Sequence, residues 1–241
     1  MRKFLLIFGL VHWTLFTVLI YLFLAFWNVN WIWVLIGSLL YGAFFVLGVV
    51  RIIRHFYHFP IPSFMTKIID NPLRRKFLQN PEVIAERMHL QPGMIVVEIG
   101  PGKGNYTKAV AKRILPDGKV YAVDISENVI GSLKIMVEKE GITNIIPHIE
   151  NAYNFSFANE SVDRIYAICC LPEIPEPVKA LRDCCRILKP DGLISLSEMF
   201  FDPDYPRRKT EKRWATEAGL ELQQEFGHWT VYQLNFGKKT T

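Results

Sequence analysis

The residues best placed to do chemistry stand at the ends of two apolar segments. Residues 96–99 include Glu98 and run into a turn with glycine at alternate positions: Gly100, Gly102 and Gly104. Glycine lets a backbone approach a ligand that a Cβ atom would keep away, and it tolerates positive φ angles. Further along, the apolar residues 120–123 end in Asp124. A glycine turn followed by a strand-terminal acid is typical of a nucleotide site in an open α/β sheet, so the sequence predicts a site for an adenosyl group.

The spacing of the glycines narrows the kind of nucleotide. A dinucleotide site has the pattern G-x-G-x-x-G, whose third glycine falls at position 105, where this chain has Asn105. The pattern from Glu98 to Gly104 is instead acid-x-Gly-x-Gly-x-Gly. This segment resembles the cofactor loop of class I S-adenosylmethionine-dependent methyltransferases, most closely their type 11 small-molecule branch.

Further landmarks of that family follow in the same order. The resemblance implies that Asp124 binds the ribose hydroxyls, that Ile125 flanks the adenine, and that Asn151 and Ala152 contact the adenine edge. The family usually has Gly-Asp-Ala at the last of these places, so Asn151 departs from the pattern, although its amide oxygen can accept the same hydrogen bond. Residues 161–166 and 188–193 resemble the fourth strand and the turn into the fifth. The resemblance implies S-adenosylmethionine as the cofactor.

Alternating strand and helix patterns support an α/β fold from residue 91 to residue 241. Near-continuous apolar runs, expected when helices cover both faces of a parallel sheet, predict strands at 94–99, 119–124, 145–150, 162–168 and 193–198. Helices are expected at 106–114, 127–140, 176–188 and 208–218, and a closing hairpin at 220–226 and 230–236. We therefore expect a Rossmann-like seven-stranded methyltransferase sheet with helices on both faces.

The first 55 residues have a different character. Residues 4–50 contain no Asp, Glu, Lys or Arg and are broken only at 28–30, so they predict two transmembrane helices at 4–27 and 31–50. Tryptophans 27, 31 and 33 flank the break, as aromatic rings do at a membrane interface. A cleaved signal peptide is disfavoured, because the apolar run is too long and a second span follows it. The fold is expected to begin with a transmembrane hairpin.

The charges around this hairpin predict its orientation. Arg2 and Lys3 precede the first span, Arg51 and Arg54 follow the second, and the intervening turn is uncharged. The positive-inside rule then places both termini and the catalytic domain of an integral membrane protein on the cytoplasmic side. S-adenosylmethionine is a cytosolic metabolite, which agrees with that orientation.

Residues 56–90 join the hairpin to the α/β domain. Arg74, Arg75 and Lys76 stand beside Leu73 and Phe77, which gives a basic amphipathic segment. Such a segment next to a bilayer suits binding to anionic lipid. A solvated lid over the cofactor is the other interpretation, and both can hold together.

The cysteines and acids give no metal-binding pattern. Cys169-Cys170 and Cys184-Cys185 are adjacent pairs without C-x-x-C spacing, so they are interpreted as reduced packing thiols. The alternative is a soft-metalloid substrate site near the first pair. The spacing of Asp202 and Asp204 is unspecific, so no metal is predicted.

The catalytic residue is the least constrained prediction. The fourth strand ends at Cys169-Cys170-Leu171-Pro172-Glu173, without the Asn/Asp-Pro-Pro-Tyr motif of many amino-group methyltransferases. That difference argues against DNA adenine and glutamine-amide substrates. Glu173 is the candidate catalytic base, with an exposed loop charge as the alternative. Weaker candidates at the same rim are Tyr153, Glu198 and His228.

These patterns together predict a membrane-anchored methyltransferase that acts on a hydrophobic or lipid-borne small molecule. A soluble small-molecule acceptor is the first alternative. A non-catalytic membrane adaptor that binds the cofactor is the second. The expected partners are the lipid bilayer and the acceptor, and the sequence shows no nucleic-acid-binding module.

Overall fold

The computed structural model of the chain describes residues 12, 14–23, 31–56 and 71–239. Contacts between Cα atoms divide the chain into two units, Met1–Tyr57 and His58–Thr241. The predicted anchor, residues 1–55, falls within the first unit. Of the predicted linker, residues 56–90, Phe56 belongs to the first unit and residues 71–90 belong to the second; residues 57–70 lie outside the described residues. The predicted boundaries stay predictions.

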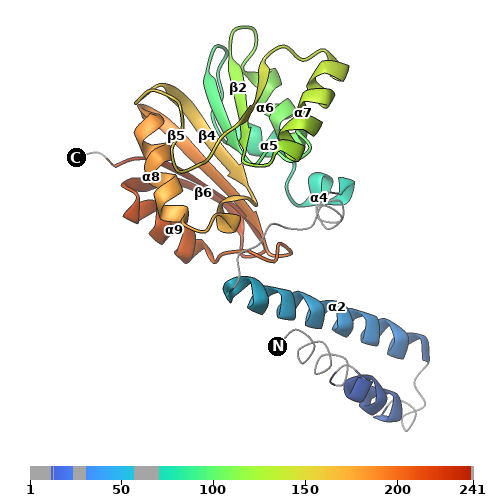
Figure 1. Ribbon diagram of the computed structural model, residues 1–241. Helices are drawn as coiled ribbons and strands as arrows, with labels where there is room; N and C mark the ends of the chain where they lie inside the picture. The colour runs from blue at the N-terminus through green and yellow to red at the C-terminus, as the bar shows by residue number, and fades with distance from the viewer. Residues whose placement is uncertain (1–11, 13, 24–30, 57–70, 240–241) are drawn as a thin grey trace. The chain divides into compact units, whose positions relative to one another are not determined.

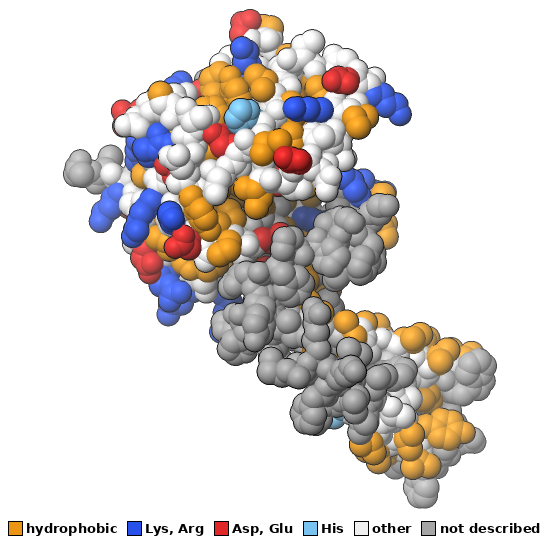
Figure 2. Space-filling view, in the orientation of Figure 1, with side chains coloured by type: hydrophobic (Ala, Val, Ile, Leu, Met, Phe, Trp, Pro, Cys, Tyr) orange, Lys and Arg blue, Asp and Glu red, His pale blue; other side chains and the backbone are white. Residues whose placement is uncertain are grey.

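The first unit contains two apolar helices, Thr14–Phe23 and α2 (Trp31–Phe56). Within α2, Ile32–Val50 is long and apolar enough to cross a membrane, and few of its residues are buried. The rings of Phe16 and Tyr41 stack with centroids 3.7 Å apart, and His12 stacks on Phe45, so the shorter helix packs along α2. Apolar side chains cover the described surface of this unit (Figure 2). Both ends of the first predicted span, residues 4–27, lie outside the described residues.

The second unit is built on a seven-stranded sheet of order β3-β2-β1-β4-β5-β7-β6 (Figure 1). Its first five strands are parallel, and β7 is antiparallel to both β5 and β6. The strands are β1 (Ile95–Ile99), β2 (Lys119–Asp124), β3 (Ile145–Ile149), β4 (Val162–Ile168), β5 (Leu188–Met199), β6 (Leu220–His228) and β7 (Val231–Lys238). The predicted fold class is confirmed for this unit.

Helices cover both faces of the sheet (Figure 1). The helical elements of this unit are α4 (Pro72–Phe77), α5 (Pro81–Glu86), α6 (Asn105–Arg113), α7 (Glu127–Glu140), the 3-10 turn η1 (Leu171–Glu173), α8 (Pro177–Ile187) and α9 (Arg208–Glu217). Successive residues of a strand face opposite sides, so Val96 packs with α5, α6 and α7, whereas Val97 packs with α8 and α9. The apolar core therefore forms two layers with the sheet between them.

Local signals in the sequence account for several element boundaries. The Ser126 hydroxyl accepts a hydrogen bond from the Val129 amide at the start of α7, and Gly141 ends that helix with φ +65°. Residues 188–193, which were expected to form the turn into the fifth strand, are already part of β5, because that strand begins at Leu188. Leu188 pairs with Val162 and Leu193 with Arg164, so the intervening residues form an irregularity within the strand. Leu188 is buried, and its pairing with Val162 satisfies its backbone before the irregularity interrupts the ladder.

Candidate functional site

The carboxyl ends of the parallel strands meet at one edge of the sheet. The strand order turns at β1, since β2 and β3 lie on one side of it and β4 and β5 on the other. Ligands of open α/β sheets bind at such a switch point. We treat this edge in two parts, the β1–β3 edge and the β4–β5 edge.

The glycine turn between β1 and α6 is closely packed at its two ends and open in the middle. Gly100 has φ +72°, and a Cβ atom there would lie 2.3 Å from the Cys170 Sγ. Gly104 caps α6 in the left-handed conformation, with φ +75°. At Gly102, by contrast, a Cβ atom would meet no heavy atom within 4 Å. The turn therefore leaves its central backbone accessible to a ligand.

Glu98 lies beneath this turn and is 2% exposed. The Thr107 hydroxyl of α6 donates a hydrogen bond to its Oε2, and the Tyr166 hydroxyl lies beside the carboxyl group without a hydrogen bond of normal geometry. Burial raises the pKa of Glu98 to about 7, against the lowering influence of these two hydroxyls. The resemblance implies one of two roles for Glu98, to anchor the glycine turn or to bind the ammonium group of the cofactor. Its position fits anchoring of the turn to α6 better than direct contact with an ammonium group.

Asp124 ends β2 next to the turn and is half-buried. Its Oδ1 accepts a hydrogen bond of 2.8 Å from the Ser126 amide, which fixes the carboxylate at the strand end. Burial raises the pKa of Asp124 above its ordinary value, and the hydrogen bonds from the backbone oppose this. Ile125, which follows, is 71% exposed and offers an apolar surface beside the carboxylate.

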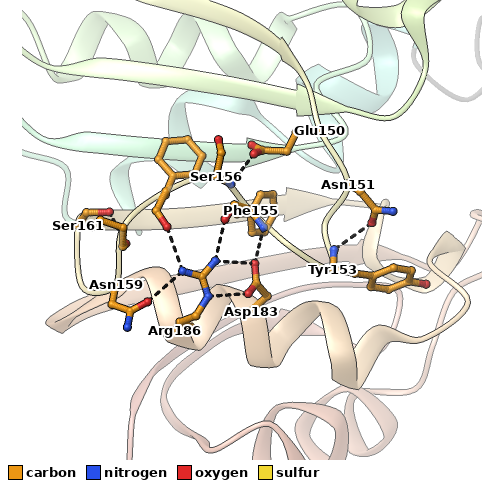
Figure 3. A network of polar contacts seen from close by, with 11 residues as sticks. Glu150, Asn151, Tyr153, Phe155, Ser156, Asn159, Ser161, Asp183 and Arg186 are labelled. Atoms are coloured by element: carbon orange, nitrogen blue, oxygen red, sulfur yellow. Dashed lines mark hydrogen bonds and ion pairs between the residues drawn. The ribbon is translucent and has the colours of Figure 1, made fainter.

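The segment after β3 holds the last two predicted cofactor residues. Asn151 is exposed and its Oδ1 accepts a hydrogen bond of 3.0 Å from the Tyr153 amide, while Ala152 is buried. Arg186 of α8 donates hydrogen bonds to the carbonyls of Phe155 and Phe157 and is paired with Asp183, as Figure 3 shows. The Asp183 carboxylate also accepts from the Phe155 amide. This network fixes the course of the chain that carries Asn151 and Ala152.

These features fit an adenosyl cofactor. The open backbone at Gly102 suits close approach of a ligand, and the Asp124 carboxylate suits a ribose diol. The exposed Ile125 suits the face of an adenine ring. The individual contacts remain predictions.

The β4–β5 edge carries the catalytic candidate and the first cysteine pair. Glu173 ends η1, where its amide donates to the Cys170 carbonyl at 3.0 Å, and its side chain is half-buried. Cys169 has φ +50°, which is strained for a residue with a Cβ atom. All four cysteines are free, and burial raises the pKa of both the Cys169 and Cys170 thiols well above the ordinary value. The first pair therefore stays protonated at neutral pH, in keeping with packing thiols.

Three residues of this edge were not among the predicted site residues. Arg74 of α4 is buried, and its guanidinium donates to Gln79 Oε1 at 2.8 Å and to Cys169 Sγ at 3.2 Å. Gln79 in turn donates to Ser197 Oγ of β5 at 3.0 Å. Glu211 of α9 is fully buried. The sequence places Arg74 in a basic run, which predicted a surface position; the structure turns it inward.

Fold and site together define an S-adenosylmethionine-dependent methyltransferase of the Rossmann-like type. The model of a methyltransferase-domain family matches residues 90–233, and the chain belongs to that family. A solved S-adenosylmethionine-dependent methyltransferase from Aquifex aeolicus superposes with a TM-score of 0.67 at 21% identity, covering 73% of this chain and 98% of that one. At this identity the superposition shows the shared fold.

Curated relatives differ in what they methylate. The demethylmenaquinone methyltransferase of Geobacillus stearothermophilus is 29% identical over 119 residues, which are 49% of this chain and 51% of that protein. The arsenite methyltransferase of Halobacterium salinarum is 27% identical over 127 residues, 53% of this chain and 32% of that protein. The chain thus spans about half or less of the length of these relatives. Their names give no single acceptor for this protein.

Proposed function

We propose that the protein is a membrane-anchored methyltransferase that transfers a methyl group from S-adenosylmethionine to a hydrophobic or lipid-borne small molecule. The observation that carries this proposal is α2, whose segment Ile32–Val50 is long enough to span a bilayer and exposes most of its apolar side chains. A lipid bilayer is the environment that buries such a helix. The helix Thr14–Phe23 packs along it, which supports the predicted hairpin.

The flanking charges support a cytoplasmic catalytic unit. Arg2 and Lys3 lie before the apolar region, and Arg51 and Arg54 lie after its second half. By the positive-inside rule, both ends of a hairpin then face the cytoplasm. S-adenosylmethionine is supplied on that side.

A tether favours an acceptor that is itself in the membrane. Confining the catalytic unit to a thin layer raises its effective concentration toward lipid-borne substrates. On α4, Leu73 and Phe77 are exposed beside Arg75 and Lys76, a combination that suits contact with an anionic bilayer. The relative that methylates demethylmenaquinone shows that a lipophilic acceptor is compatible with this family.

The chain's own residues divide the work of transfer. When bound, S-adenosylmethionine supplies a methyl group that its sulfonium has already activated for in-line displacement. The backbone of Gly100, Gly102 and Gly104 would hold the methionine end, and Asp124 would accept hydrogen bonds from the ribose hydroxyls. Ile125, Asn151 and Ala152 would hold the adenine. The protein mainly aligns the acceptor and excludes water, and Glu173 at the rim is the sequence-predicted base.

A soluble acceptor is the second candidate. The arsenite methyltransferase among the relatives and the partly exposed pair Cys169 and Cys170 favour a soft metalloid. The raised pKa values of these thiols count against it, because the thiolate is the form that binds soft ions.

The test uses the full-length protein in its own membranes with radiolabelled methyl donor, followed by organic and aqueous extraction. The Asp124→Ala variant provides the background. Label in the organic phase only with the intact protein supports a lipid-borne acceptor. Label confined to the aqueous or protein fraction overturns the lipid-borne acceptor and leaves the enzyme class. Absence of label from every fraction favours the non-catalytic adaptor that binds the cofactor over an enzyme.

A further inference from the structure

Glu198 is an unusual residue of the β4–β5 edge. It stands at the carboxyl end of β5, is 0% exposed, and neither carboxylate oxygen has a hydrogen-bond partner among the residues that the structure describes. A buried carboxylate without partners costs several kcal/mol, and such a group in a native fold calls for an explanation. Asp183 shows the usual solution, since Arg186 pairs with it directly.

Glu198 faces the place where the cofactor turn meets the β4–β5 edge. Cys170 follows β4 and packs against Gly100 of the cofactor turn. The amide of its neighbour Cys169 donates to the carbonyl of Ser197, the residue before Glu198. Glu198 therefore stands at the strand end that adjoins the cofactor turn through the Cys169-Cys170 segment. An acceptor aligned with the methyl group has to lie on this side of the turn.

Among the described residues, the charged and titratable groups that act on Glu198 are Arg74 of α4, Cys169 and Cys170 after β4, Glu173 of η1, Asp202 after β5, Glu211 of α9 and Tyr232 of β7. In this described set the acids outnumber the arginine, and Arg74 donates hydrogen bonds to Gln79 and Cys169. Burial first, and then the neighbouring Glu211 and Asp202, raise the pKa of Glu198 well above its ordinary value.

Glu211 is a second buried carboxylate beside the first. Neither of its oxygens has a hydrogen bond of normal geometry within the described residues, although the Tyr232 hydroxyl, which donates to the Pro206 carbonyl, lies beside it. Burial raises the pKa of Glu211 to about 8, against the lowering influence of that hydroxyl. Two like carboxylates in one buried site cannot both ionise easily. A carboxylate of such a pair that is ionised can accept a proton from a group placed against it, which is what general-base work needs.

We propose that Glu198, supported by Glu211, accepts the proton that the methyl acceptor loses, and that this acceptor reacts through a hydroxyl or amino group, whose proton can be donated directly to the buried carboxylate. The inference rests on the proposed function and names the chemistry of its acceptor. In the step, the bond between the acceptor oxygen or nitrogen and the methyl carbon forms while the bond from sulfur to that carbon breaks. Its electron pair stays on sulfur, which becomes a neutral thioether, and the acceptor proton moves to Glu198 and then to solvent.

The position of Glu198 suits this role better than that of Glu173. Glu173 is half-exposed at the rim, where water competes for its carboxylate. Glu198 is fully buried, and among the described residues its oxygens have none of the hydrogen bonds that would weaken it as a base. A hydroxyl or amino group from an acceptor supplies the missing donor.

The experiment compares wild-type protein, Glu198→Gln, Glu211→Gln and the exposed control Glu221→Gln, all full-length in membranes. Binding of S-adenosylhomocysteine is measured by calorimetry, and transfer of labelled methyl groups to extracted membrane components is measured from pH 5 to pH 9. We expect Glu198→Gln to bind within twofold of wild type and to lose transfer by about 100-fold or more, the usual weight of a general base. Glu211→Gln removes a like charge, so it lowers the pKa of Glu198 and moves the acidic limb of the rate profile to lower pH.

Each outcome is decisive. Transfer by Glu198→Gln within threefold of wild type overturns the role of Glu198 and leaves the proposed function standing. Loss of S-adenosylhomocysteine binding together with transfer in both variants, but not in Glu221→Gln, shows a structural role and also overturns it. A labelled product that mass spectrometry shows to carry the methyl group on carbon overturns the hydroxyl or amino class. Wild-type protein that transfers no label rejects the proposed function itself, and this inference with it.

Discussion

The two halves of the ligand-binding edge are assembled in different ways. At the β1–β3 edge, Glu98 accepts from Thr107 and Asp124 accepts from Ser126, so these two carboxyl groups are satisfied by residues close in sequence. At the β4–β5 edge, Arg74 reaches Cys169 and Gln79 reaches Ser197, contacts that span 95 and 118 positions of the chain. There the carboxylates of Glu198 and Glu211 lack hydrogen-bond partners among the described residues.

This difference agrees with the kind of ligand proposed for each half, the cofactor at the β1–β3 edge and the acceptor at the β4–β5 edge. S-adenosylmethionine has the same adenosyl and methionine parts in every enzyme that uses it, so a short local motif can hold it. An acceptor varies from one enzyme to the next, as the relatives show. The β4–β5 edge is assembled from α4, β5 and α9, which are far apart in the sequence. The variants below test whether the two edges differ in this way.

The largest expected effect belongs to the glycine turn. Gly100→Ala places a Cβ atom 2.3 Å from Cys170 Sγ at a residue with φ +72°. Backbone strain and overpacking together cost on the order of 2–6 kcal/mol, so we expect affinity for S-adenosylhomocysteine to fall by about 100-fold or more. Calorimetry measures the affinity of wild type and variant for S-adenosylhomocysteine. Gly93→Ala is the matched control, since Gly93 has φ +84° but no atom near its Cβ position. Equal losses in both variants would show that the close contact with Cys170 is unimportant.

Glu98→Gln tests the satisfied buried carboxyl of the same edge. The folded-state pKa of Glu98 is about 7, above the ordinary value of 4.5, so its favourable contribution is complete below pH 4.5 and is lost as pH rises through 7. The full loss is about 3 kcal/mol, equivalent to roughly 6–12 °C in the unfolding midpoint of a unit this size. We expect the wild-type midpoint to fall more than that of Glu98→Gln between pH 5 and pH 8. The exposed Glu138→Gln should follow wild type; a parallel fall in all three proteins would contradict the assignment.

The sequence predicted the elements of the β1–β3 edge well because the residues that define them are close together in the chain. The glycine pattern, the strand-terminal Asp124 and the Ser126 cap are all within short windows, and periodicity placed β2, β4 and α7 at their observed limits. The seven-stranded sheet followed from alternation of strands and helices.

At the β4–β5 edge the sequence pointed to Glu173, Glu198 and the first cysteine pair as candidates, but it did not predict the buried Arg74, Gln79 and Glu211. Arg74 is followed by Arg75 and Lys76, and a basic run predicts a solvated face; only the packing of α4 shows that one of the three turns inward. Glu211 sits in the strongly charged helix α9, where an acid is expected to face water. Its burial depends on Tyr232 and Glu198, which belong to strands outside its own neighbourhood in the sequence.

Asp124→Ala tests the ribose contact of the β1–β3 edge. Losing a charged hydrogen-bond acceptor costs about 1.5–3 kcal/mol, so affinity for S-adenosylmethionine should fall by roughly 10- to 100-fold. The ionised carboxylate is the binding form, and its pKa is raised. Wild-type affinity therefore falls as pH drops through that pKa, whereas the variant lacks this dependence. Calorimetry from pH 4.5 to pH 8 measures both effects, with the exposed Asp117→Ala as control. An unchanged affinity would remove Asp124 from the site.

Arg74→Lys has the smallest expected effect and bears most directly on the comparison. A lysine ammonium cannot reproduce the guanidinium geometry that joins Gln79 Oε1 and Cys169 Sγ. The variant therefore loses hydrogen bonds that fix α4 to the β4–β5 edge. We expect transfer to fall about 3- to 10-fold, the worth of about one net hydrogen bond, with S-adenosylhomocysteine affinity within twofold of wild type. Arg75→Lys, its neighbour on the same helix, is the control. The double variant Arg74→Lys with Asp124→Ala should show the product of the two single losses, because independent sites are additive. A departure from that product would show that the two edges act as one site.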